Sequence, residues 1–288
     1  MAELERLVGR LAMELVSVTG NQSDIAYLGW PGADKNGSIM HRPDCAVEVG
    51  RTCLDLNRLA REVTAIQRLA PQIVLLHSWA SIVYSNAHLD ALKQAYTAAN
   101  FIGVKLGFVT ERQLECLAET GERPFPLRDA KLIIVPRVTH TPDATVRALE
   151  RLARSGVSVI FIGEDCLGRT EYDEQRGSMP FAPTYILPAG VDEKEIWRWL
   201  ERNVERLGVR REVTLRDEKG EPFWGVEYLA ARFDDRILVN ICNYTRQPLR
   251  VRIYRDGRPA EGFDLIGGKG LGRTFAVQPL VPFLVSLR

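Results

Sequence analysis

The pattern of apolar and polar positions divides the chain into three regions. In the first, apolar residues recur at helical spacing over 4–15, and a second amphipathic helix is expected over about 55–69. A short apolar stretch at 25–30 ends in Trp30, and a loop rich in glycine and polar residues follows it. We therefore predict that residues 1–70 form a mainly helical N-terminal segment.

The middle region alternates expected strands with expected helices. Nearly continuous apolar runs predict strands at 72–78, 103–110, 131–136 and 157–162, and helices are expected at 87–99, 141–155 and 192–207. One helix has a clear start at Thr141-Pro142, with Thr141 as its N-cap, and a clear stop at Gly156. This alternation is typical of a parallel sheet with helices on both faces, so we predict an α/β domain over 71–207.

After Gly208 the pattern changes to short runs of β-forming residues. Strands are expected at 212–215, 224–233, 237–243, 249–254, 274–277 and 282–287. Turns are predicted at Asp234-Asp235, at Asp256-Gly257 and at Gly267-Gly268. The sequence here predicts a small antiparallel β-sandwich over 208–288.

Composition narrows the class of protein. The 288 residues include 38 Lys plus Arg and 37 Asp plus Glu, a net charge of +1, which argues against a nucleic-acid or membrane partner. No apolar run has the length of a membrane helix, and the amphipathic start is unlike a secretory signal. The 5 cysteines are scattered and fit neither a disulfide framework nor a zinc site. We expect a cytoplasmic protein with reduced thiols.

A first candidate for chemistry follows the predicted strand 157–162, where Glu164, Asp165 and Cys166 lie together. Ligands bind at the carboxyl ends of strands in open α/β sheets, so Cys166 is a candidate nucleophile. However, the spacing is not G-x-C-x-G, and no histidine follows Cys166, which leaves His140 as the nearest candidate base. The alternative interpretation is a buried or loop thiol.

A second candidate is the cluster of His41, Arg42 and Asp44, which follows Trp30 and the glycine-rich loop. These side chains can stack on a sugar ring and hydrogen-bond its hydroxyls. An Arg–Asp pair that braces the loop is the other interpretation. The glycine-rich segments at 103–107 and 267–270 are not followed by helices, which argues against a phosphate loop. The histidines show no metal-ligand spacing, so we expect neither cofactor nor metal.

The order of these regions resembles the C-terminal half of family 42 glycoside hydrolases, the β-galactosidase-like enzymes. The matching features are the strand 72–78 followed by Trp79, the strand 132–136, the strand 156–162, the acidic loop 171–174 and the Leu238-Val239-Asn240 strand. The resemblance implies a flavodoxin-like trimerisation domain followed by a terminal β-sandwich. It also implies that 25–30 is the last strand of a (β/α)8 barrel, with Trp30 at the floor of the sugar site, and that 55–69 is the last barrel helix.

The chain departs from the family at the catalytic centre. Retaining enzymes of this type need two carboxylates about 5–5.5 Å apart, on the ends of barrel strands. A whole barrel takes about 250 residues, and only residues 1–70 precede the α/β region. The two catalytic glutamates therefore have no matching positions, and we predict no catalytic residue. Glu3, Glu5 and Glu14 lie in a predicted helix, where solvent-facing charge is expected.

Three functions follow as hypotheses. The first is a non-catalytic C-terminal portion of a β-galactosidase-like hydrolase, serving oligomerisation and completing a partner's sugar site with Trp30, His41, Arg42 and Asp44. Its partner would be another copy or a chain that supplies the missing barrel. The second is a stand-alone, amidotransferase-like enzyme that uses Cys166. The third is a carbohydrate-binding protein, with Trp224, Tyr228 or Tyr244 exposed on the sandwich unless these rings pack its core.

Overall fold

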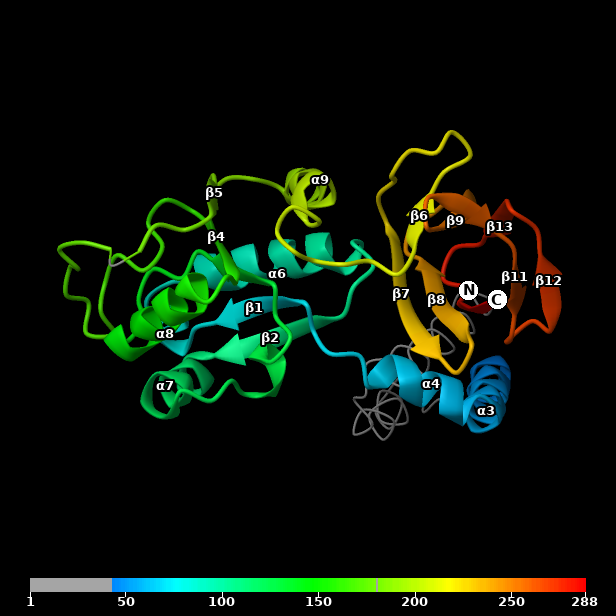
Figure 1. Cartoon of the computed structure of the whole chain (residues 1–288), viewed down its shortest axis with the longest axis horizontal. Coiled ribbons are helices and arrows are strands. Elements are labelled where there is room, and N and C mark those ends of the chain that lie inside the picture. Colours follow the sequence, from blue (N-terminus) through cyan, green and yellow to red (C-terminus); the bar gives the residue numbers. More distant parts are fainter. Residues whose placement is uncertain (1–42, 180) are drawn as a thin grey trace. The chain divides into compact units, whose positions relative to one another are not determined.

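The structure is a computed structural model that describes residues 43–179 and 181–288 (Figure 1). The chain divides into two compact units. One consists of Ala70–Arg211, and the other combines the chain up to Leu69 with Glu212–Arg288. The division into 1–70, 71–207 and 208–288 stays a prediction. Each unit is described by itself below.

The Ala70–Arg211 unit is built around one parallel sheet. Its elements in chain order are β1 (Ile73–His77), α5 (Trp79–Tyr84), α6 (Ala87–Asn100), β2 (Leu106–Thr110), α7 (Glu111–Thr120), the 3-10 helix η3 (Phe125–Leu127), β3 (Leu132–Pro136), α8 (Asp143–Arg154), β4 (Ser158–Ile162), β5 (Tyr185–Leu187) and α9 (Glu193–Asn203). The strand order is β2-β1-β3-β4-β5, all parallel. This is the flavodoxin-like order.

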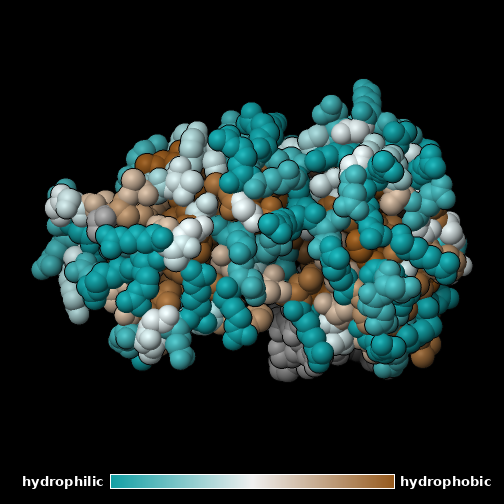
Figure 2. All heavy atoms as spheres, in the orientation of Figure 1, coloured by the Kyte–Doolittle hydropathy of each residue, from teal (hydrophilic) through white to brown (hydrophobic). Residues whose placement is uncertain are grey.

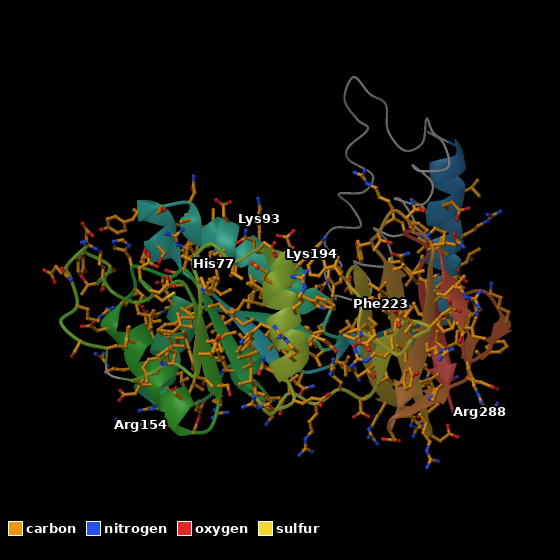
Figure 3. The ribbon with its side chains drawn as sticks, turned by 90° about the horizontal axis from the view of Figure 1, so that it is seen from above. His77, Lys93, Arg154, Lys194, Phe223 and Arg288 are labelled. Carbon is orange, nitrogen blue, oxygen red and sulfur yellow. The ribbon has the colours of Figure 1, made fainter. Side chains whose placement is uncertain are left out.

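Helices cover both faces of this sheet. Helix α6 contacts α9, and α7 contacts α8. Figure 3 shows Lys93 of α6 and Lys194 of α9 over one side of the sheet and Arg154 of α8 over the other. All residues of β3 are buried, as are four of the five in β1 and in β4, which explains their continuous apolar sequences.

The predicted helix stop is confirmed, and the predicted cap is wrong. Helix α8 ends at Arg154, and Gly156 follows with a left-handed φ of +89°. The N-cap position belongs to Pro142, because the hydroxyl of Thr141 donates to the buried Glu111 carboxylate instead of capping the helix. Helices α5 and α7 and the short strand β5 complete the unit in addition to the predicted elements.

The second unit contains an antiparallel β-sandwich. Its elements are α3 (Pro43–Arg58), α4 (Ala60–Gln67), β6 (Thr214–Arg216), β7 (Val226–Phe233), β8 (Arg236–Asn243), β9 (Leu249–Arg255), β10 (Arg258–Ala260), β11 (Gly262–Asp264), β12 (Lys269–Leu271), β13 (Phe275–Val277) and β14 (Phe283–Leu287). One sheet has the order β12-β11-β14-β8-β7, and the other joins β10, β9 and β13, with β6 also on β9. The predicted fold class, a flavodoxin-like sheet followed by a β-sandwich, is confirmed.

The three predicted turns are present. Asp234-Asp235 connects β7 to β8, and Asp256-Gly257 connects β9 to β10 with φ angles of 49° and 76°. Two consecutive positive φ angles are typical of the turn that matches strand twist in hairpins. Gly267-Gly268 lies between β11 and β12, where the Gly268 N–H donates to the Asp264 carbonyl.

Helix α4 packs on the sandwich. Leu59, which precedes α4, and Ile66 belong to an apolar cluster with Leu229 of β7, Leu238 of β8 and Leu284 of β14. In addition, Glu62 of α4 accepts a hydrogen bond of 2.7 Å from Arg236 of β8. Residues far apart in the sequence therefore share one core in this unit.

Candidate functional site

The predicted sugar-site residues cannot be compared with one another in space. Trp30, His41 and Arg42 lie outside the described residues. Asp44 belongs to the first turn of α3, but its side chain is also outside the described part. The site therefore stays a prediction, and the described chemistry lies at the carboxyl edge of the parallel sheet.

This edge contains a buried network centred on Glu111. The strand order reverses between β1 and β3, and in flavodoxin-like folds such a reversal opens the crevice that holds the ligand. Here the 7% exposed Glu111 accepts hydrogen bonds from the hydroxyls of Ser78 (2.7 Å) and Thr141 (3.0 Å). It also accepts the backbone N–H groups of Trp79 (3.0 Å) and Ala80 (3.2 Å). We call Ser78, Ser81, His88, Glu111, His140 and Thr141 the switch-point cluster.

Helix capping brings these side chains to the edge. Ser78 directly follows β1 and caps α5, accepting the Ser81 N–H at 3.0 Å. Thr110 ends β2 and forms a reciprocal capping box with Gln113, so that Glu111 becomes the first residue of α7. The Thr-x-x-Gln pattern was a sequence signal for this helix start. No pattern in the sequence indicated that the Glu111 side chain turns inward.

His88 of α6 connects two strand ends. Its Nδ1 lies 2.6 Å from the Pro136 carbonyl, and its Nε2 lies 3.0 Å from the Ser78 backbone nitrogen. Because the carbonyl only accepts and the N–H only donates, the proton is on Nδ1 and the ring is neutral. Burial lowers the pKa of His88, opposed by the Pro136 hydrogen bond. Both ring nitrogens thus serve the fold.

His140, the candidate base, fastens a surface loop. Its Nε2 lies 3.0 Å from Asp173 Oδ1, and its ring stacks on Tyr84 with centroids 4.0 Å apart. Arg169 donates to the same carboxylate oxygen at 2.8 Å. The hydrogen bond to His140, followed by the contact with Arg169, holds the pKa of Asp173 below its ordinary value. These contacts tie the acidic loop 171–174 to the sheet edge.

Cys166, the candidate nucleophile, is buried. Its thiol is 3% exposed and donates to the carbonyls of Ile162 (3.3 Å) and Val135 (3.5 Å). Burial, together with the nearby Asp165 charge, raises the pKa of Cys166 to about 12. Reactive cysteines are instead partly exposed with lowered pKa values. Glu164 and Asp165 are exposed beside it, so the buried-thiol interpretation agrees with the structure and the nucleophile hypothesis does not.

The sandwich aromatics differ in exposure. Tyr228 is 3% exposed and belongs to the sandwich core. The prediction that it is an exposed sugar-binding ring is therefore wrong. Trp224 is half-buried, and Tyr244 is 36% exposed. Within residues 43–179 and 181–288, no three His, Cys, Asp or Glu side chains are grouped to hold a metal ion. Across the same ranges, no helix combines the length and apolar character needed to span a membrane.

The two folds place the chain in a known structural class. No protein-family model matches its sequence, and no curated protein matches it by sequence comparison. Solved structures do match, and they include glycoside hydrolases of family 42 (GH42). The predicted resemblance to part of a family 42 enzyme is therefore confirmed at the level of the fold.

Three of these structures illustrate the match. An apo exo-carrageenase GH42 from Bacteroides ovatus has a TM-score of 0.71 and 17% identity, over 88% of this chain and 34% of its own. A GH42 β-galactosidase from G. stearothermophilus has a TM-score of 0.62 and 12% identity, over 85% and 44%. A β-galactosidase from Bacillus circulans sp. alkalophilus has a TM-score of 0.59 and 10% identity, over 85% and 45%. The matched region thus spans less than half of each of these enzymes.

Proposed function

We propose that this chain is the non-catalytic C-terminal portion of a GH42-like glycoside hydrolase, that it mediates oligomerisation, and that it completes a sugar site in a partner chain. The partner is another copy or a chain that carries the barrel. The completed sugar site would use Trp30, His41, Arg42 and Asp44. A cytoplasmic location is part of the same proposal.

The hydrogen-bonded switch-point cluster is the observation that supports the non-catalytic role. A flavodoxin-like sheet normally keeps this crevice open for a ligand. Here the Glu111 carboxylate accepts hydrogen bonds from the Ser78 and Thr141 hydroxyls. Both ring nitrogens of His88 are hydrogen-bonded to the backbone, at Ser78 and Pro136. Cys166 is also buried with a raised pKa, so Glu111, His88 and Cys166 together support a structural role for this edge.

The exposed side of α5 supports self-association. Trp79 and Val83 are one helical turn apart and are 65% and 79% exposed. Tyr84, which is 45% exposed, donates a hydrogen bond to the Glu171 carbonyl. This contact brings Tyr172, which follows Glu171 in the chain and is 77% exposed, to the same region. We call Trp79, Val83, Tyr84 and Tyr172 the α5 patch. The face of the protein in Figure 2 is mostly hydrophilic, and clustered apolar exposure of this kind marks interaction surfaces.

Sedimentation or light scattering of the purified chain tests the oligomerisation. We expect a defined oligomer that dissociates in a Trp79→Ser, Val83→Asp variant. Phe125→Ser is the matched control, since Phe125 is 63% exposed and lies outside the α5 patch. A wild-type monomer at high concentration, or an oligomer that ignores the double substitution, would refute the self-association.

A panel of chromogenic aryl glycosides, galactosides included, tests the non-catalytic role. We expect no hydrolysis by the chain alone above the level of a buffer blank. Hydrolysis by the chain alone would mean that it contains a functional carboxylate pair, and the non-catalytic proposal would be wrong. In the proposed arrangement, activity returns only when a chain carrying the barrel strands is added.

A further inference from the structure

A groove separate from the switch-point cluster lies beside helix α9. Its volume is about 430 Å³, and it is lined by Leu187 at the end of β5, by residues of the segment 188–191 that follows, and by Glu195, Arg198, Trp199 and Arg202 of α9. This volume is within the usual range of small-molecule sites, roughly 300–1,000 Å³. None of the switch-point residues lines it.

An aromatic surface forms one part of the groove region. Trp199 is half-buried, and its ring stacks with that of Tyr185 in the edge strand β5, with centroids 4.8 Å apart and planes 28° from parallel. Tyr185 is 47% exposed. Because the two rings cover one face of each other, Trp199, the ring that lines the groove, offers only its outer face to a ligand, and the C–H face of a sugar ring suits such an aromatic face.

The charges next to this aromatic face are positive. Arg198 and Arg202 are one turn apart on α9, both are exposed, and within the described residues neither forms an ion pair with a carboxylate. Arg202 Nε donates to the Arg198 carbonyl at 3.0 Å, which keeps its guanidinium against the helix. The acidic side chain that lines the groove, Glu195, accepts the Asp192 backbone N–H at 3.2 Å in the capping box of α9.

We propose that this groove binds an anionic saccharide. The sugar ring stacks on the Trp199 ring, which Tyr185 supports from its other face, and the Arg198–Arg202 pair binds the sulfate or carboxylate group of the sugar. Guanidinium groups present paired N–H donors that match the oxygens of such anions. The proposal concerns a site on the flavodoxin-like unit and does not depend on self-association through the α5 patch or on the absence of catalysis.

Calorimetric titration of the full chain tests the proposal with four probes: a sulfated galacto-oligosaccharide, its desulfated counterpart, inorganic sulfate and AMP. We expect the sulfated oligosaccharide to bind at least about tenfold more tightly than the desulfated one, because two charge-assisted contacts are lost. Added NaCl should weaken only the sulfated ligand, since exposed ion pairs are screened by salt.

Variants separate the two parts of the site. Trp199→Ala should weaken both oligosaccharides by up to about tenfold, because the stacking surface is lost. The double variant Arg198→Ala, Arg202→Ala should weaken only the sulfated one, by roughly tenfold. The matched control is Arg128→Ala, Arg147→Ala, which removes the same charge from exposed positions outside the groove.

Several results would overturn the proposal. One is that no oligosaccharide binds, and another is that the arginine double variant binds the sulfated oligosaccharide as tightly as the wild type does. A third is that inorganic sulfate binds as tightly as the sulfated oligosaccharide. A fourth is that AMP binds more tightly than the oligosaccharide, which would indicate a nucleotide site. The arginine variants replace exposed side chains, so they keep the test decisive if Trp199→Ala fails to fold. An oligomerisation failure leaves all of these titrations interpretable, so the two proposals fail independently.

Discussion

Replacing Glu111 with alanine removes a buried acceptor that joins the ends of β1, β2 and β3. The carboxylate accepts four hydrogen bonds, two from the hydroxyls of Ser78 and Thr141 and two from the backbone N–H groups of Trp79 and Ala80. Ser78, Trp79 and Ala80 are consecutive, whereas Glu111 and Thr141 belong to two other segments, so the three segments meet only in the folded unit. The substitution therefore tests whether the switch-point cluster stabilises the sheet edge.

The expected cost follows from which donors find new partners. Ser78 Oγ also lies 3.0 Å from Ser81 Oγ and 3.1 Å from the His140 carbonyl, so its proton has another acceptor. Thr141 and the two backbone N–H groups do not gain one, and three under-satisfied donors cost about 3 kcal/mol together. In Glu111→Gln the amide oxygen can still accept the two N–H groups, which reduces the loss to about 1 kcal/mol.

Hydrogen exchange of the amides in β1 and β3 measures this free energy for the parallel-sheet unit alone. In a thermal melt, the alanine variant should lose about 6–12 °C, at about 2–4 °C per kcal/mol. Glu119→Ala is the control, because Glu119 is an exposed glutamate of the same helix. If Glu111→Ala cost no more than Glu119→Ala, the hydrogen bonds would contribute nothing to stability and the reasoning would be refuted.

Three further predictions concern other buried groups. His88 has a lowered pKa, so below its ordinary value of 6.5 the unfolded chain binds a proton that the folded chain does not. The free energy of unfolding should fall as the pH drops below 6.5. In His88→Gln, urea titrations at several pH values should show a smaller decline. The same decline in the variant and the wild type would contradict the prediction. Cys166, whose pKa is raised to about 12, should resist iodoacetamide at pH 8 until the protein is denatured, and mass spectrometry showing rapid labelling of the native protein would disprove this. Glu62→Ala should cost about 1 kcal/mol in the sandwich unit by breaking its 2.7 Å pair with Arg236, and an unchanged melting temperature would count against the pair.

Local sequence patterns were enough for most of the fold. The apolar runs became β1, β3 and β4 because a parallel sheet covered on both faces needs continuous apolar strands. The pattern failed where elements are short or half-exposed. Strand β5 has two exposed residues, Tyr185 and Ile186, among its three, and β10 to β12 are three residues each. Segments this short do not show the alternation of apolar and polar residues that predicts a strand.

The candidate chemistry was less predictable than the fold. The position of Cys166 after a strand suggested a nucleophile, and only burial and its two carbonyl contacts showed a structural thiol. Glu111 begins α7, a helix that was not among the predicted elements. Its role depends on donors from β1 and from the segment after β3, and no local pattern specifies such contacts.

The sequence by itself determined the alternation of the main strands and helices in the α/β domain, the turns at Asp234-Asp235 and Asp256-Gly257, and the resemblance to part of a family 42 enzyme. These features depend on residues close together in the chain, where periodicity, capping and turn preferences act. The tertiary structure decided that α4 packs on the sandwich, that Glu111 accepts hydrogen bonds at the switch point, and that Trp199 stacks on Tyr185 beside two arginines. Such arrangements depend on contacts between distant residues, and these exist only once the whole chain has folded.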